Sequence, residues 1–365
     1  MASQSSEATE ECSAPVNAQD SMVWPGHEAT MVTAWGHDWV VVVAPRFPAS
    51  EPLKFYVLGR ERCQGKRLRA PDGLKVLDLA TGANSSRLAL AQGEEGGALL
   101  EHTGSGWKPL ALLPEAISEV SASARLIADG DNVLIVDRST LWFRQDSTWA
   151  RMALPDDSQV APIASDTLLL VGSRLYVGTQ RGEYGGLLAA FDLDTSSNTA
   201  VLVKEASVLE LALPVWAMVA DAQGQIWAAC GLAHLGRREG RVMKFRDDKW
   251  AVFAHSDSKS APNSSWNLPP AAFVSVQLDH EGRPLVLGRG TGLAKFTGVG
   301  WRRIGTNWPD FHHVDDRLGG SIVFPNEPDR FVLIDQNTAI LAAKARGAFL
   351  YDLKSGALTP IELLD

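Results

Sequence analysis

The sequence predicts an all-β protein, a seven-bladed β-propeller of four-stranded antiparallel blades, from three observations. A phrase of turns and short β-rich runs recurs along the chain, its period suits a four-stranded unit, and helical periodicity is almost missing. The 365 residues are 45% hydrophobic and 21% charged, which is typical of a folded globular protein. The predicted propeller covers residues 22–365. A six-bladed ring with an irregular N-terminal addition is the alternative.

The repeated phrase is clearest in residues 129–149 and 279–301. Each stretch contains a turn, a short β-rich run, an Arg-containing turn, a second run and another turn before a Trp. Seven copies can be indexed by a residue in the second predicted strand of each: Val40, Leu88, Val133, Leu175, Ile226, Leu285 and Ile340. Successive index residues are 42 to 59 positions apart. A period of this size, with four short strands in each unit, is typical of a propeller.

Three residue patterns assign the strands within a copy. Gly130, Gly224 and Gly282 fall between the first and second strands, where a tight hairpin turn needs a positive φ. Continuous hydrophobic runs at residues 40–43, 133–136 and 285–287 predict strands that are covered on both faces by neighbouring blades. A Trp begins the predicted outer strand in four copies, where it can cover the seam with the next blade. These residues are Trp107, Trp149, Trp250 and Trp301.

Several copies share a finer motif, an Asp and a Gly in a turn followed by a hydrophobic strand and a Gly-Leu pair. The best matches are Asp279 and Gly282 with residues 290–296, Asp221 and Gly224 with Trp227, and residues 177–179 with Gly186 and Leu187. These motifs, within residues 74–363, resemble the propeller repeats of the two-component-regulator sensor family. Members of that family are typically extracellular sensor domains joined to a membrane helix and a kinase, so the resemblance implies a propeller fold for this chain.

Composition and the N-terminal sequence indicate the setting. The net charge of −9 has the wrong sign for a surface that binds nucleic acid or an anionic membrane as a whole, and neither partner is expected. The three cysteines, Cys12, Cys63 and Cys230, are far apart and odd in number, which argues against a disulfide framework. Residues 1–21 lack a basic and an apolar region and are predicted to be a flexible tail without a secretory signal. We therefore expect a cytoplasmic protein.

Arginines mark the predicted loops between the second and third strands. Six of the seven copies have one there: Arg46, Arg138, Arg181, Arg237 with Arg238, Arg289 and Arg346. The remaining copy has Gln92, Glu94 and Glu95 instead. If the arginines turned to the axis they would form a positive ring suited to a carboxylate, a phosphate or an acidic protein segment. The alternative, which the sequence favours, is exposed arginines neutralised by neighbouring carboxylates.

Two predicted blade connections are long and contain aromatic residues. Residues 254–270 hold Trp266, and residues 305–320 hold Trp308 and Phe311. Long loops in a compact fold are often functional, and these aromatics can either anchor a partner or plug the central channel. His312 follows them and joins the same candidate binding surface. Together with His313, Asp315 and Asp316 it suggests a metal site, but adjacent histidines are poor ligands for one ion, so we expect a polar loop and no metal.

No motif for reaction chemistry is present in the sequence, neither a nucleophile elbow, nor a phosphate-binding loop, nor a dinucleotide fingerprint. The basic run at residues 60–69 lacks interleaved aromatics and is interpreted as a loop on a solvated edge. The sequence thus predicts a non-enzymatic binding module that needs no cofactor and docks a protein partner, as an immunity, inhibitor or scaffold factor would. The alternative is a propeller hydrolase or lyase, or a sensor of an anionic small ligand, with its site at the channel mouth.

Overall fold

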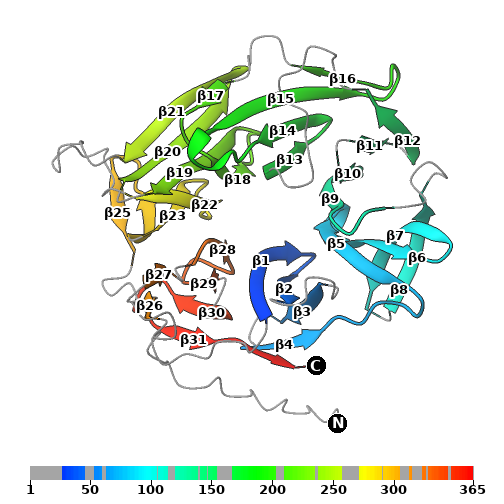
Figure 1. The fold of residues 1–365 in the computed structure, drawn as a ribbon, viewed down its shortest axis with the longest axis horizontal. Coiled ribbons are helices and arrows are strands. Elements are labelled where there is room, and N and C mark those ends of the chain that lie inside the picture. The colour runs from blue at the N-terminus through cyan, green and yellow to red at the C-terminus, as the bar shows by residue number, and fades with distance from the viewer. Residues whose placement is uncertain are drawn as a thin grey trace, which may run out of the picture.

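Seven antiparallel sheets stand in a ring around a central axis, as seen in a computed structural model of the chain (Figure 1). The structure describes residues 27–45, 53–59, 63–104, 106–113, 120–138, 140–145, 147–153, 167–202, 209–234, 237–256, 271–289, 291–304, 312–314, 323–325, 328–343 and 347–364. The predicted seven-bladed propeller is confirmed. The predicted tail, residues 1–21, lies outside the described residues.

Each sheet is one blade, and the blades follow the order of the chain. Blade 1 contains β1 (His27–Trp35), β2 (Asp38–Pro45), β3 (Lys54–Leu58) and β4 (Gln64–Arg67), and blade 2 contains β5 (Lys75–Thr81), β6 (Arg87–Gly93), β7 (Gly96–Thr103) and β8 (Gly106–Leu112). Blade 3 contains β9 (Arg125–Asp129), β10 (Asn132–Asp137), β11 (Thr140–Gln145) and β12 (Thr148–Met152), and blade 4 contains β13 (Thr167–Val171), β14 (Arg174–Gly178), β15 (Gly186–Asp194) and β16 (Thr199–Leu202). Blade 4 also has β17 (Leu209–Leu211), which pairs with β15.

The remaining three blades complete the ring. Blade 5 contains β18 (Val215–Ala220), β19 (Ile226–His234), β20 (Arg237–Arg246) and β21 (Lys249–Ser256), and blade 6 contains β22 (Ala272–Leu278), β23 (Pro284–Arg289), β24 (Gly292–Phe296) and β25 (Trp301–Arg303). Blade 7 contains β28 (Arg330–Leu333), β29 (Thr338–Ala343), β30 (Gly347–Asp352) and β31 (Leu358–Pro360). A hairpin of β26 (His312–Val314) and β27 (Val323–Pro325) lies between blades 6 and 7 in the chain.

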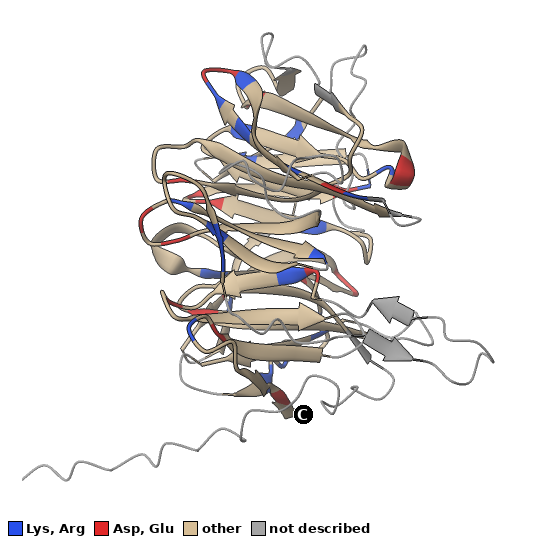
Figure 2. Cartoon of the chain, turned by 90° about the vertical axis from the view of Figure 1, so that its left-hand side faces the viewer, with Lys and Arg blue, Asp and Glu red and all other residues tan. Residues whose placement is uncertain are grey.

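All seven index residues of the sequence repeat lie in the second strand of a blade, β2, β6, β10, β14, β19, β23 and β29. The first strands contact one another from blade to blade around the whole ring and therefore line the axis. Since successive strands are antiparallel, the turns between second and third strands and the connections between blades share one face of the ring, which we call the 2–3 face. The opposite face, with the turns between first and second strands, is the 1–2 face. Seen from the side, turns at both faces carry charges of both signs (Figure 2).

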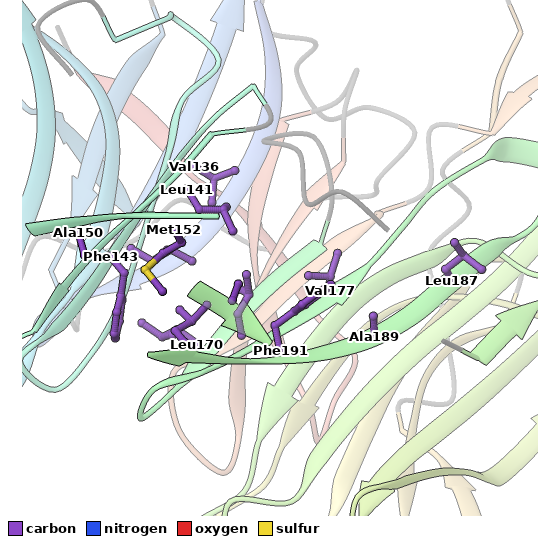
Figure 3. Packing of buried hydrophobic residues seen from close by; sticks show 14 residues of the cluster. Val136, Leu141, Phe143, Ala150, Met152, Leu170, Val177, Leu187, Ala189 and Phe191 are labelled. Carbon is purple, nitrogen blue, oxygen red and sulfur yellow. The ribbon is translucent and has the colours of Figure 1, made fainter. Parts of the chain in front are cut away.

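The hydrophobic core is a series of apolar layers between neighbouring blades. Figure 3 shows the layer between blades 3 and 4, where Phe143 and Met152 of one blade face Leu170 and Phe191 of the next. Alternate residues of one strand serve opposite layers, because side chains in a strand point alternately to its two faces. Val40 and Val42 pack toward blade 2, whereas Val41 and Val43 pack toward blade 7. The prediction that the continuous hydrophobic runs form strands covered on both faces is therefore confirmed for this run.

The predicted turn and seam residues are also confirmed. Gly130, Gly224 and Gly282 lie between first and second strands with φ of 58°, 75° and 72°. The four tryptophans stand at the start of the fourth strands β8, β12, β21 and β25. Trp250 of blade 5, for example, lies 6.4 Å from Tyr176 of blade 4 between ring centroids, in an edge-on arrangement. These tryptophans therefore cover seams, which is their structural role.

The C-terminal strand closes the ring. β32 (Glu362–Leu364) pairs in parallel with β4, the outer strand of blade 1, so that the two ends of the propeller are hydrogen-bonded together. The Glu362 N–H donates to the carbonyl of Cys63 at 2.8 Å, and the Gln64 amide donates to the Glu362 carboxylate at 3.1 Å. The sequence did not predict this fifth strand, because parallel pairing between distant segments has no local pattern.

The cysteines differ from the prediction. Cys63 is disulfide-bonded, a bond that the argument against a disulfide framework did not anticipate. The number and spacing of cysteines were poor guides because a disulfide needs only two cysteines brought close by the fold. The cytoplasmic location, which relied partly on those cysteines, stays a prediction. In the described part of the chain, no helix has the length and apolar character to cross a membrane.

Cys230, in β19, is a free and fully buried thiol. Burial raises its pKa to about 12, against a smaller opposite influence of Arg241. The reactive thiolate is therefore scarce at neutral pH. We expect Cys230 to resist alkylation in the native protein and to react once the chain unfolds. Mass mapping of the Cys230 peptide after iodoacetamide treatment, with and without denaturant, measures this; rapid labelling of the native protein would contradict it.

Candidate functional site

The described arginines of the predicted loop ring occupy different surroundings. Arg138 is exposed in the β10–β11 turn with a φ of 55°, and Arg181 is exposed before a 3-10 turn, η3 (Gly182–Tyr184). Arg289, at the end of β23, is half-buried, and its guanidinium carbon lies 5.3 Å from the ring centroid of Trp216 in the first strand of blade 5. Arg237 and Arg238 begin β20, and the side chain of Arg238 is exposed. Arg289 alone among the described side chains of this set has a ring contact with a strand that lines the axis, through Trp216 of β18.

The other predicted site residues lie outside what the structure describes. Arg46, Arg346, Trp266, Trp308 and Phe311 belong to segments that are not described, and for His312 only its place in β26 is given. Their role in binding stays a prediction. The Gln92 amide oxygen, in the blade without a loop arginine, accepts a hydrogen bond from the Val120 N–H at 3.0 Å and so ties blade 2 to the connection that follows it.

The first strands supply two arginines that sequence reasoning missed. Arg125 is the first residue of β9, and Arg330 is the first residue of β28. Both therefore stand at the 2–3 face, where the first strands begin, beside the axis. The available signal was a basic residue at the head of the hydrophobic run in these two strands, which residue type alone does not place beside the axis. We call Arg125, Arg289 and Arg330 the axial arginine cluster.

Arg125 is held by a buried carboxylate of the neighbouring blade. Its Nε donates to Oδ2 of Asp78 at 2.9 Å, and its Nη2 lies 4.0 Å from the sulfur of Met31. Asp78 is only 4% exposed and also accepts the backbone N–H groups of Leu79 and Leu126, each at 2.9 Å. One carboxylate thus joins blades 2 and 3 and fixes the guanidinium beside the first strands of three blades.

Arg330 is anchored by backbone carbonyls. Its Nη1 donates to the carbonyl of Asp329 at 3.0 Å and to that of Val274 at 3.3 Å. Val274 is the unpaired residue of a β-bulge in β22, so its carbonyl is available to the guanidinium. Burial lowers the pKa of Arg330, Asp329 opposes this, and the positive charges of Arg125 and Arg289 lower it further. Arg125 and Arg289 thus each act electrostatically on Arg330.

The chemistry available here is recognition of an anion. Guanidinium groups present paired N–H donors that match a carboxylate or a phosphate, and partial burial strengthens the attraction. Asp78 and Asp329 supply two negative charges against three positive ones, so the cluster keeps an excess of positive charge on a chain whose net charge is −9. Among the described residues, no group of three or more His, Cys, Asp or Glu is arranged to hold a metal ion.

A cavity of about 420 Å³ opens on the opposite, 1–2 face between blades 6 and 7. Its charged lining residues include Asp279 and Lys295, whose ammonium lies 2.7 Å from the Asp279 carboxylate. Arg283 donates to the same carboxylate oxygen at 3.1 Å. Burial alone would raise the pKa of Asp279, but the hydrogen bonds from Lys295 and Arg283 outweigh it and lower the pKa. Asp279 also accepts two backbone N–H groups of its own turn, which gives it a structural role.

The fold is shared with solved propellers. YCF48 bound to D1 peptide matches with 12% sequence identity and a TM-score of 0.52, over 93% of this chain and 96% of that chain. A putative 6-phosphogluconolactonase from Bacteroides fragilis matches with 11% identity and a TM-score of 0.52, over 90% and 95%. PorZ, a surface component of the type-IX secretion system of Porphyromonas gingivalis, matches with 13% identity and a TM-score of 0.51, over 91% of this chain and 46% of that chain.

No protein-family model and no curated protein matches the sequence. At these identities the likeness to solved structures shows the fold alone. The resemblance to the two-component-regulator propellers accordingly holds for the architecture, seven blades of short antiparallel strands. The candidate site is the 2–3 face with its axial arginine cluster.

Proposed function

We propose that this propeller is a non-enzymatic binding module that docks a protein partner through its 2–3 face, with an acidic segment of the partner at the axial arginine cluster. The observation that carries the proposal is the gathering of Arg125, Arg289 and Arg330 at one end of the axis. A face that carries three guanidinium groups attracts a carboxylate-bearing partner and repels basic ones. The same fold accommodates a peptide in YCF48, which supports a peptide-binding role.

The test is quantitative capture from lysate of the native source with tagged protein, followed by mass spectrometry and by affinity measurement with the purified partner. The variant Arg289→Ala/Arg330→Ala removes two of the three axial charges. We expect its affinity for the partner to fall by about tenfold or more, because each guanidinium is partly desolvated on docking.

A matched control is Arg302→Ala/Arg303→Ala. These two arginines are exposed on the outer strand β25, so the control loses the same charge away from the axis. It should bind as the wild type does. Equal binding by both variants would refute the axial site. Because Arg330 contributes buried hydrogen bonds, the single variant Arg289→Glu serves as a second probe if the double variant is unstable.

A further inference from the structure

The cavity of about 420 Å³ on the 1–2 face occupies the end of the apolar layer between blades 6 and 7. Four of its lining residues belong to that layer or pack against it and form an apolar floor: Leu285, Ile304, Leu333 and Leu353. On this face the structure describes all four turns of the two blades, residues 279–283, 297–300, 334–337 and 353–357. We call this cavity the blade 6–7 pocket.

A leucine stands in this seam at the position where four other seams have a tryptophan. In blade 5, for example, Trp250 is paired across the strands with Phe245, and both rings lie against Tyr176 of the preceding blade. In blade 7 the corresponding pair is Tyr351 and Leu358, which pack against blade 6. Because leucine is smaller than tryptophan, the 1–2 end of the seam between blades 6 and 7 is left open, and the blade 6–7 pocket lies at that end.

The blade 6 wall carries two cations side by side. Leu285, Lys295 and Arg302 are opposite one another on β23, β24 and β25, so their side chains share the face that is turned to blade 7. Lys295 donates to Asp279, which also receives Arg283 and two backbone N–H groups, and an ammonium has two further N–H groups to offer. Arg302 is exposed, and among the described residues its guanidinium has no hydrogen-bond or ion-pair partner.

The blade 7 wall carries charges of both signs. The exposed carboxylate of Asp335 accepts two backbone N–H groups of its own turn, at 2.7 and 2.9 Å. Lys354 is exposed on the same wall and follows Asp352, whose carboxylate accepts two backbone N–H groups at 2.9 and 2.6 Å. A ligand with several negative charges is therefore disfavoured by the blade 7 carboxylates, whereas a single carboxylate is accommodated at the cations of blade 6.

We propose that the blade 6–7 pocket binds a small aliphatic carboxylate, with the carboxylate at Lys295 and Arg302 and the hydrocarbon body on the apolar floor. Pairing of a carboxylate with a guanidinium is bidentate and charge-assisted, which fixes the polar end of the ligand. An apolar lining with a few placed polar groups is typical of small-molecule sites, and the volume of about 420 Å³ suits them. The pocket lies on the face opposite to the axial arginine cluster, so this inference goes beyond the proposed function and does not depend on it.

Isothermal titration calorimetry of the full-length protein with octanoate, butyrate and octanol tests the proposal. Butyrate keeps the carboxylate and loses four methylene groups, whereas octanol keeps the hydrocarbon and loses the charge. We expect octanoate to bind at least about tenfold more tightly than either, because only octanoate satisfies both the cations and the floor. Equal binding of butyrate would overturn the apolar half of the proposal, and equal binding of octanol the charged half. No binding of octanoate would overturn the proposal as a whole.

Two variants locate the binding. Arg302→Gln removes the guanidinium from an exposed position, so the fold should persist, and octanoate affinity should fall by about tenfold or more. Leu353→Trp enlarges a half-buried side chain of the floor and should abolish binding while it leaves every charge in place. If the tryptophan variant does not fold, Arg302→Gln still decides the point.

The matched control is Arg303→Gln. Arg303 is the next residue of β25, is exposed and does not line the pocket, because alternate residues of a strand point to opposite faces. This control loses the same charge and should bind octanoate as the wild type does. Equal loss of affinity in Arg302→Gln and Arg303→Gln would show non-specific attraction and overturn the site.

Further arms separate the proposal from its alternatives. Tighter binding of a peptide that ends in leucine with a free carboxylate would replace the free acid by the C-terminus of a protein. Tighter binding of free leucine would show that Asp335 holds an ammonium group and would replace the simple acid by a zwitterion. The axial variant Arg289→Ala/Arg330→Ala should retain octanoate binding, and Arg302→Gln should retain partner capture, because the two sites lie on opposite faces. Failure of one proposal is therefore distinguishable from failure of the other.

Discussion

Replacement of Trp35 by alanine is expected to lower the free energy of unfolding by about 3–5 kcal/mol, which is the range for a large aromatic deleted from a core. Trp35 ends β1 of blade 1 and is fully buried, yet its ring contacts belong to blade 2. Its ring centroid lies 5.3 Å from that of His102 and 5.9 Å from that of Trp107. Its Nε1 donates to the carbonyl of Leu88 at 2.9 Å. One side chain thus fills the seam between two blades.

Guanidinium chloride unfolding followed by far-UV circular dichroism measures the change. The matched variant Trp35→Phe keeps a smaller aromatic ring in the seam and loses the Nε1 hydrogen bond, so it should cost about 1–2 kcal/mol. A Trp35→Ala protein within about 0.5 kcal/mol of the wild type would mean that the seam closes without the indole. If both variants lost the same amount, the hydrogen bond rather than the packing would account for the effect.

The fold was predictable because its signals are local. The run Val40–Val43 belongs to a strand packed on both faces, and each glycine of the type of Gly282 marks a hairpin turn; both patterns are visible without knowing the partner strand. Seven such units at a regular period then require a ring. The closing strand β32 was not predictable, because its parallel pairing depends on which distant segments meet. The disulfide of Cys63 was not predictable, because such a bond needs the fold to bring two cysteines close.

The candidate site was less predictable than the fold. Residue type and loop position marked Arg289 of blade 6. Arg125 belongs to blade 3 and Arg330 to blade 7, so neither lies near Arg289 in the sequence. Arg125 and Arg330 lie beside the axis because the first strand of each blade lines it. That position of the first strand follows only from the arrangement of the blades in the ring. The described part of the basic run at residues 60–69 is a second example, because it forms the wall of a cavity only where β4 meets the next blade.

Loss of the Asp78 carboxylate is the second large effect that we expect. Asp78→Ala should cost about 3 kcal/mol, because the backbone N–H groups of Leu79 and Leu126 and the guanidinium of Arg125 all lose a buried acceptor. Asp78→Asn retains one acceptor oxygen and turns an amide N–H₂ toward a donor, so about half of that loss is expected. Denaturant unfolding of both variants, beside the control Asp131→Ala at an exposed residue of the 1–2 face, measures these differences.

The same substitution also tests whether stability and binding are coupled at the axis. Arg125 is oriented by Asp78, so releasing it should weaken partner binding in Asp78→Asn even under conditions where that variant is fully folded. The control Asp131→Ala should change stability by less than about 0.5 kcal/mol and leave partner binding unaltered. A folded Asp78→Asn protein with wild-type affinity would remove Arg125 from the binding surface and leave Arg289 and Arg330 as its charged centre. If only Asp78→Ala lost affinity, and lost stability with it, the loss of affinity would reflect unfolding. The affinity of the folded Asp78→Asn protein therefore decides whether Arg125 belongs to the binding surface.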